Sequence, residues 1–447
     1  MSWRLAGVSL AALLLPPLTF AQSSSQPPQL SPEAAYTQVL LPLTITRASV
    51  DNWSDSELAA LKVATDQARL ECAARSPQTF RGDDLVALAR LCSLGQQWSS
   101  VTAAAKQYID STDSPKPLLA RAYGLEIDAA LHIRDEAAAL AASHAMLAAV
   151  PYDTTADEAL NETLRYLQLA YMPDALALYA EREPLLLAAL RASKDEPAPA
   201  PPAGQHVSVS ALYAGGLAFA ALEQFAGKPA DAEATVVDLD TALAAAPAPL
   251  QPDDALPIAD ARRQYALLGH PLPKIPLAVS LYAEHETPLI DDNYGASTVL
   301  FLFPPWCAQC VRMGQSFMSV LLRLSDEHVH LYGLLAQQPP PTPAPPAVVV
   351  HSNGTMSGAK HTHAKAAPPE PETPKTAADL LRHTPTLIVP PETLTQFAAT
   401  NFPLLIATDS NGIIRFIQPA PEPALNPGDF LDQVTTHIAA QWPRTSK

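Results

Sequence analysis

The pattern of hydrophobic residues changes at Gly269, and this change divides the chain into two parts. Before it, from about Ser54, apolar residues recur every three or four positions, the spacing that lines one face of a helix. After it, short apolar runs typical of strands alternate with helical runs. The sequence therefore predicts a multidomain chain, with an all-α domain at 54–269 and an α/β domain at 270–447.

The first part is expected to consist of paired helices joined by short turns. Pro151, Pro173 and Pro229 lie between the periodic runs, because the interior of a helix rejects proline. Beyond two helices that carry Cys72 and Cys92, the predicted helices are 118–133, 136–150, 155–171, 174–191, 207–226 and 229–246. The arrangement loosely resembles a tetratricopeptide-like array of helical hairpins, and an irregular helical bundle is the alternative. Either would suit a scaffold or the binding of a protein partner better than catalysis.

The second part begins with a proline-rich linker at 270–276 and is then expected to alternate strands and helices. The predicted strands are 277–282, 298–303, 329–335, 386–389, 402–408 and 413–417, and the predicted helices are 310–324, 376–383, 392–399 and 429–440. Residues 338–375 interrupt this order. They are rich in proline and cannot supply a packed core, so we predict a solvated, disordered insertion there.

The N-terminal segment has the features of a secretory signal peptide. Arg4 precedes a short apolar run, and Thr19-Phe20-Ala21 offers small residues before a cleavage site. The run is shorter than the roughly 20 apolar residues that span a membrane. We therefore expect 1–21 to be a signal peptide and 22–53 an N-terminal extension. The protein is predicted to be exported, periplasmic or extracellular, without a stable membrane anchor.

Composition narrows the choice of partners and cofactors. Hydrophobic residues make up 48% of the 447-residue chain, which is enough for a core, and the net charge of −17 should repel nucleic acid. His351, His361 and His363 lie in the proline-rich insertion, where His-x-His spacing can hold copper or zinc loosely. A solvated tract that happens to contain histidine is the preferred interpretation, so we predict no metal site and no cofactor.

The motif that bears most directly on chemistry is Trp306-Cys307-Ala308-Gln309-Cys310, which follows an apolar strand and opens an apolar helix. A zinc site would need two further ligands, and the other cysteines lie in the helical part. At a helix N-terminus, Cys307 would be stabilised as the nucleophilic thiolate. Cys310, one turn later, could resolve a mixed disulfide. The motif predicts a redox-active pair, and a static disulfide is the alternative.

With this motif, residues from about 277 to 440 resemble the thioredoxin-like superfamily, in particular its exported thiol-disulfide oxidoreductases. The second point of resemblance is 401–414, where a proline opens a strand that leads to a hairpin with Asp and Gly. The resemblance implies that Pro403 is cis and lies against the disulfide. It also implies that Phe402 contacts the substrate backbone, while Trp306 shields the cysteines. The implied partners are protein thiols or disulfides and a protein that donates or accepts electrons.

The chain departs from this family at positions that handle protons. Many members carry a buried acid six residues before the first cysteine, where this chain has Phe301. Another subgroup carries a glutamate and then a proline after the second cysteine, where this chain has Met313 and Gln315. Without an acid to accept the proton of Cys310, turnover is expected to be slow. This departure favours the alternative of a redox-inert scaffold that works through its helical domain.

Cys72 and Cys92 form the second cysteine pair. They fall on the apolar faces of successive predicted helices, so we expect a structural disulfide that pins a helical hairpin. Closing a loop of this length contributes roughly 3 kcal/mol in the chain-entropy model. The leading hypothesis is thus an exported thiol-disulfide oxidoreductase, with chemistry at Cys307 and Cys310.

Overall fold

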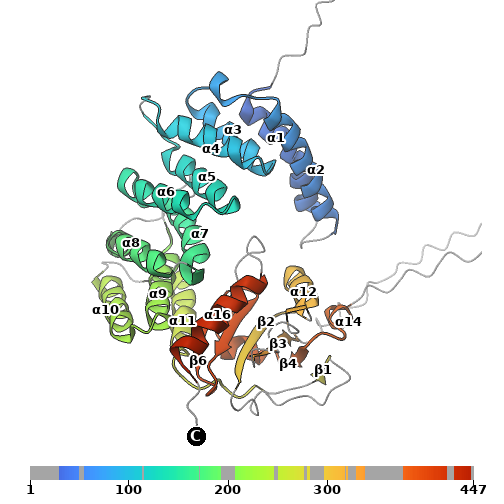
Figure 1. Cartoon of the computed structure of the whole chain (residues 1–447), viewed down its shortest axis with the longest axis vertical. Coiled ribbons are helices and arrows are strands. Elements are labelled where there is room, and N and C mark those ends of the chain that lie inside the picture. Colours follow the sequence, from blue (N-terminus) through green and yellow to red (C-terminus); the bar gives the residue numbers. More distant parts are fainter. Residues whose placement is uncertain are drawn as a thin grey trace, which may run out of the picture.

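An arc of helices and a smaller part built on a β-sheet make up the chain, and the sheet part lies at the open side of the arc (Figure 1). The computed structural model describes residues 30–49, 55–112, 115–170, 172–192, 207–245, 250–275, 279–281, 296–317, 319–320, 329–337, 376–419 and 427–443. A helical part followed by an α/β part agrees with the predicted fold class. The predicted signal peptide, 1–21, and the insertion, 338–375, lie outside the described residues.

The described helices of the arc pack in chain order, most of them against their sequence neighbours, whereas α11 packs against α9. They are α1 (Pro32–Ser49), α2 (Asp55–Ala73), α3 (Asp83–Leu94), α4 (Trp98–Ile109), α5 (Leu119–His132), α6 (Glu136–Ala149), α7 (Thr154–Ala170), α8 (Met172–Ala192), α9 (Val209–Phe225), α10 (Pro229–Ala245) and α11 (Pro252–Tyr265). None of these helices, nor any other described one, is long and apolar enough to cross a membrane.

Helix α1 corrects the predicted N-terminal boundary. It lies within residues 22–53, the predicted N-terminal extension, and it packs against both α2 and α3. Its buried face consists of Ala35, Val39 and Leu43, at the i, i+4 spacing of a helix. Pro42 lies inside the helix and masks this signal in the sequence. The helical part therefore begins with α1 and not near residue 54.

Three of the turns between paired helices have the same geometry. In each, the helix is followed by a residue with positive φ: Gln96 (56°), Arg134 (60°) or Gly227 (76°). The next N–H donates to the carbonyl five residues back, in the pairs Gln97 to Cys92, Asp135 to Ala130 and Lys228 to Glu223. This bond is the closing bond of the Schellman motif, which satisfies the last carbonyls of a helix. The hairpins α3–α4, α5–α6 and α9–α10 therefore turn back in the same way.

The sheet has six strands in the order β1-β4-β3-β2-β5-β6 among the described residues. The strands are β1 (Val279–Ser280), β2 (Ser297–Phe303), β3 (Val329–Ala336), β4 (Thr386–Val389), β5 (Leu404–Thr408) and β6 (Ile414–Pro419). Strands β4, β3 and β2 are parallel, whereas β1, β5 and β6 are each antiparallel to a neighbour. The helices of this part are α12 (Ala308–Gln315), α14 (Ala377–Leu380), α15 (Glu392–Gln396) and α16 (Pro427–Gln441).

Both faces of the sheet are covered, which explains why β2 is a continuous apolar run. On one face, Phe301 and its neighbours share a cluster with residues of α12, α16 and the helical arc. On the other face, Leu300 and Leu302 pack with Phe397, after α15, and with Leu268 and Ile275 from the linker region. The predicted linker is thus partly docked onto the sheet, and its backbone also pairs with the start of β6.

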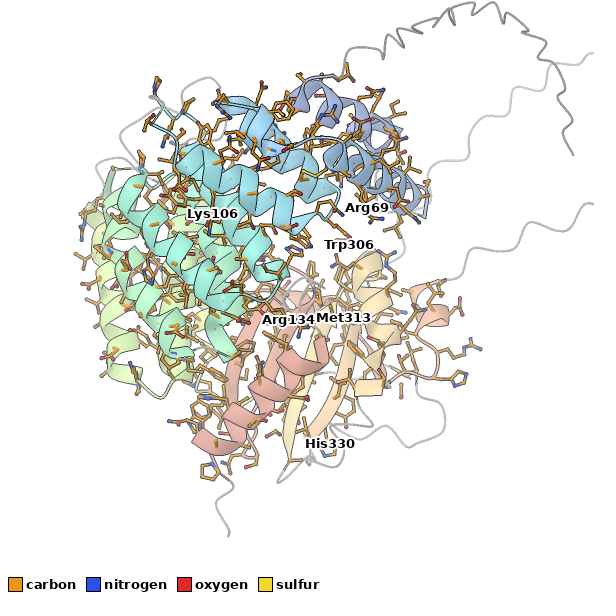
Figure 2. All side chains as sticks on the ribbon, turned by 45° about the horizontal axis from the view of Figure 1, so that its top comes forward. Arg69, Lys106, Arg134, Trp306, Met313 and His330 are labelled. Atoms are coloured by element: carbon orange, nitrogen blue, oxygen red, sulfur yellow. A yellow bond between two sulfur atoms is a disulfide. The ribbon has the colours of Figure 1, made fainter. Side chains whose placement is uncertain are left out.

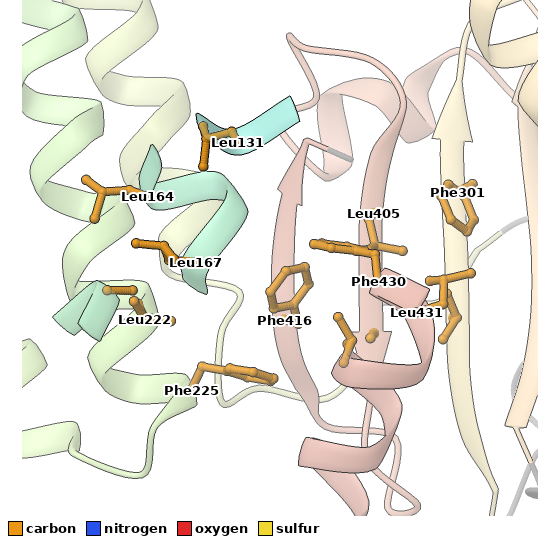
Figure 3. Packing of buried hydrophobic residues seen from close by; sticks show 14 of the residues in the cluster. Leu131, Leu164, Leu167, Leu222, Phe225, Phe301, Leu405, Phe416, Phe430 and Leu431 are labelled. Atoms are coloured by element: carbon orange, nitrogen blue, oxygen red, sulfur yellow. The ribbon is translucent and has the colours of Figure 1, made fainter. Parts of the chain in front are cut away.

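The arc and the sheet part are joined by aromatic packing around the end of α9 (Figure 3). Phe225 is 2% exposed, and its ring centroid lies 5.3 Å from that of Phe416 and 4.3 Å from that of His437. The Nε2 atom of His437 lies 2.8 Å from the carbonyl oxygen of Phe225. A Cβ atom at Gly227 would collide with Gln441, so the α9–α10 turn fits closely against α16. This contact fixes the sheet part relative to the helices.

Candidate functional site

The Cys307–Cys310 pair lies where the central strand β2 leads into helix α12. The two sulfur atoms are bonded, and the Cα atoms are 5.2 Å apart. Cys307 is the N-cap of α12, and its Sγ accepts a hydrogen bond from the Cys310 N–H at 3.3 Å. Cys307 is partly exposed, whereas Cys310 is 1% exposed. The partly exposed cysteine therefore lies at a helix N-terminus, where a thiolate is stabilised, and the other cysteine is buried.

The predicted substrate-binding residues lie together beside this pair. Trp306 is 54% exposed, and its ring meets that of Phe402 edge-on, with centroids 5.5 Å apart. The Phe402–Pro403 peptide bond is cis, as the resemblance implied. Because Leu302 of β2 pairs with Leu404 of β5, Pro403 lies at the end of the sheet from which α12 begins. The fold thus brings the five predicted catalytic and substrate-binding residues to the end of the sheet at which α12 begins. They are Trp306, Cys307, Cys310, Phe402 and Pro403.

The surroundings of Cys310 are apolar. It shares a buried cluster with Phe301, Phe303 and Phe317, and the rings of Phe301 and Phe317 lie 4.8 Å apart. Met313 packs against the same cluster, so no carboxylate comes from the two positions where the resemblance would place one. An apolar setting disfavours a charged thiolate.

The second pair, Cys72 and Cys92, joins α2 to α3. The structure bonds the two sulfur atoms, with Cα atoms 5.1 Å apart, and the side chains are 1% and 0% exposed. Both residues belong to the core that packs α1, α2 and α3 together. A disulfide that is enclosed in this way is inaccessible to thiols in solution, so its role is structural.

Replacing Cys72 and Cys92 together by alanine should lower the free energy of unfolding by about 3 kcal/mol, because the unfolded chain gains the freedom of an open loop. The measurement is urea unfolding followed by circular dichroism. The matched control replaces Cys307 and Cys310, which close a much shorter loop, and should lose less stability. Equal losses from the two double variants would contradict this account of Cys72 and Cys92.

In the described part of the chain, no cluster of three or more His, Cys, Asp or Glu side chains could hold a metal ion. The histidines considered for metal binding, His351, His361 and His363, lie outside the described residues.

Sequence reasoning missed a group of side chains at the α3–α4 and α5–α6 turns. The ring of His132 stacks on Trp98 with centroids 3.9 Å apart. Its Nδ1 atom lies 2.9 Å from the Asp128 carboxylate, which also accepts a hydrogen bond from Ser93 at 3.2 Å. Burial raises the pKa of Asp128, and the nearby His132 opposes this effect. The serine hydroxyl faces the carboxylate and not the imidazole, so the group lacks the geometry of a catalytic triad. The contact between Ser93 and Asp128 joins residues 35 positions apart, and no local sequence motif indicates it.

No protein-family model, curated protein or solved structure matches this chain.

Proposed function

We propose that this protein is an exported thiol-disulfide oxidoreductase whose sheet part is a thioredoxin-like domain. The observation that carries the proposal is the Cys307–Cys310 disulfide, with the first sulfur accessible at the start of α12 and the second buried. Two further features support it. The cis peptide bond before Pro403 lies at the same sheet edge, and parallel central strands are flanked by the antiparallel hairpin of β5 and β6.

The proposed chemistry is exchange through a mixed disulfide. The reduced Cys307 thiolate attacks one sulfur of a protein disulfide, and the other client sulfur leaves as a thiolate. The Cys310 thiolate then attacks the Cys307 sulfur, which releases the second client thiol. The client disulfide has become two thiols, and the cysteine pair has become the disulfide seen here. Running the same steps backwards oxidises a client dithiol.

The redox potential of the Cys307–Cys310 couple tests this proposal. We expect the pair to equilibrate with glutathione or dithiothreitol buffers at a potential above about −300 mV, the region below which structural disulfides lie. Mass spectrometry after alkylation would count the free thiols at each buffer ratio. A lower potential would contradict the proposal and favour the alternative, in which the helical arc is a scaffold and the cysteine pair is static. The missing acid at Phe301 is the observation that favours this alternative.

A further inference from the structure

The helical arc presents a small exposed surface formed by two neighbouring turns, the α3–α4 and α5–α6 turns. It consists of Trp98, His132, Ile133 and Arg134, which we call the turn surface. The stacking of His132 on Trp98 holds the two turns together. Ile133 is 55% exposed, and Arg134 is exposed without an ion pair to any described residue. A single exposed isoleucine beside an arginine that pairs with no described residue is common on protein surfaces, so its relevance depends on what it faces.

The sheet part presents a second such surface around Trp306. Trp306 and Leu380 are the two large apolar side chains that are exposed in the described sheet part. Arg312 of α12 is exposed and, like Arg134, makes no ion pair with a described residue. Cys307 thus lies next to an exposed aromatic ring, at the start of a helix whose Arg312 pairs with no described residue.

The two surfaces lie on sides of the arc and the sheet part that face each other. Figure 1 shows the C-terminal end of α5 on the inner side of the arc, above α12 and α16. Figure 2, turned from that view, shows Arg134 on the side of the arc towards Met313 of α12, with Trp306 also directed towards the helices. The α9–α10 turn contacts α16 at Gly227, where a Cβ atom would collide with Gln441, whereas the α5–α6 turn leaves Ile133 exposed.

We propose that the turn surface and the surface around Trp306 together bind an extended client segment, in which a cysteine is flanked by apolar and acidic residues. This inference rests on the proposed function, because the client cysteine is the one that exchanges with Cys307. Ile133 and Trp306 contact the apolar residues, and Arg134 and Arg312 pair with the acidic ones. The net charge of −17 and the exposed Asp135 beside Arg134 would by themselves favour a basic client, so a preference for acidic segments has to come from Arg134 and Arg312.

The experiment compares two synthetic peptides with a Leu-Cys-Leu centre, flanked by aspartates in one and by lysines in the other. Each peptide carries its cysteine as a disulfide with thionitrobenzoate. The Cys307 thiolate of a Cys310→Ser protein attacks the peptide sulfur, and the coloured thionitrobenzoate thiolate leaves. The rate is followed by absorbance at low ionic strength, where charge effects are least screened.

We expect the acidic peptide to react faster than the basic one, and Arg134→Glu to slow the acidic peptide by about threefold, as for one exposed ion pair. The matched control is Arg121→Glu, at the other end of α5 and about 20 Å away along the helix axis, which should change neither rate. The mercaptoethanol–thionitrobenzoate disulfide has no side chains to bind and should react equally with all variants. A basic preference, or equal effects of the two substitutions, would overturn the proposal.

A binding measurement separates this inference from the proposed function. Fluorescence anisotropy of a labelled peptide detects binding without exchange when serine replaces the cysteine of the peptide and the protein carries Cys307→Ser. Preferential binding of the acidic peptide to this protein, lost in Arg134→Glu, would support the client surface even if the cysteine pair proved redox-inert. Rapid exchange with the small disulfide but no preference between the peptides would support the oxidoreductase proposal and contradict the proposed client surface.

Discussion

Cys307→Ser is expected to abolish disulfide exchange, whereas Cys310→Ser should preserve the first step and block the second. The reason is the difference in exposure between the two cysteine residues. Cys307 is accessible at the N-terminus of α12, and Cys310 is 1% exposed beneath it. Only Cys307 can therefore attack a client disulfide. Without its nucleophile the protein should lose about 10³-fold or more in rate, as for other nucleophile deletions.

Gel electrophoresis without reductant and quenched-flow kinetics would measure this difference. Cys310→Ser should accumulate a covalent complex with a disulfide substrate. Dithiothreitol should cleave this complex by reducing the mixed disulfide. Cys307→Ser should form none, and the Cys72→Ala/Cys92→Ala variant should behave like the unmodified protein. If Cys307→Ser retained the rate, or if Cys310→Ser released product as fast as the original chain, the assignment of the two roles would be wrong.

The sheet part followed from the sequence largely because its central strands are buried on both faces. A continuous apolar run such as 298–303 then differs clearly from the polar residues around it, and β4 lies at the predicted positions 386–389. The motif at Cys307 was readable for the same reason, because it joins such a strand to a helix. The local sequence was therefore enough to predict both the strand and the cysteine motif that follows it.

The helices of the first part were harder to predict from the sequence. Helix α4 was not predicted, although Val101, Ala104, Ala105 and Tyr108 form a buried face with helical spacing. Serine and threonine in its first turns, which are weak helix formers, obscured the pattern. Helix α11 has one fully buried apolar residue, Ile258, and a proline inside it, so the sequence offered almost no period to detect. Tertiary packing, more than the local sequence, stabilises both helices.

Contacts between distant parts of the chain could not be predicted from the sequence. The packing of Phe225 against Phe416 and His437 joins residues about 200 positions apart, and nothing near Phe225 indicates a partner. The turn surface depends in the same way on the stacking of Trp98 and His132. The cysteines of the candidate site were predictable, whereas the long-range contacts that place the helical turns opposite them were not.

The helical part also contains a buried ion pair that no sequence pattern indicated. Arg182 of α8 is 1% exposed, and its Nη2 lies 2.5 Å from the carboxylate Oδ1 of Asp157 in α7. Its Nε donates to the hydroxyl of Tyr152 at 2.6 Å, and burial raises the pKa of that phenol. A charge in such a setting is tolerated only because its partner is present.

Asp157→Leu is accordingly expected to cost about 3–5 kcal/mol of stability, because it leaves the guanidinium of Arg182 buried and unpaired. Arg182→Met should be costly for the reciprocal reason. The double variant Asp157→Leu/Arg182→Met removes both charges and should be more stable than either single variant, since an apolar pair of similar volume often replaces a buried ion pair without loss. Urea unfolding of the four proteins measures the coupling. If the double variant lost the sum of the two single losses, Asp157 and Arg182 would not be coupled in energy, and this account of the ion pair would be wrong.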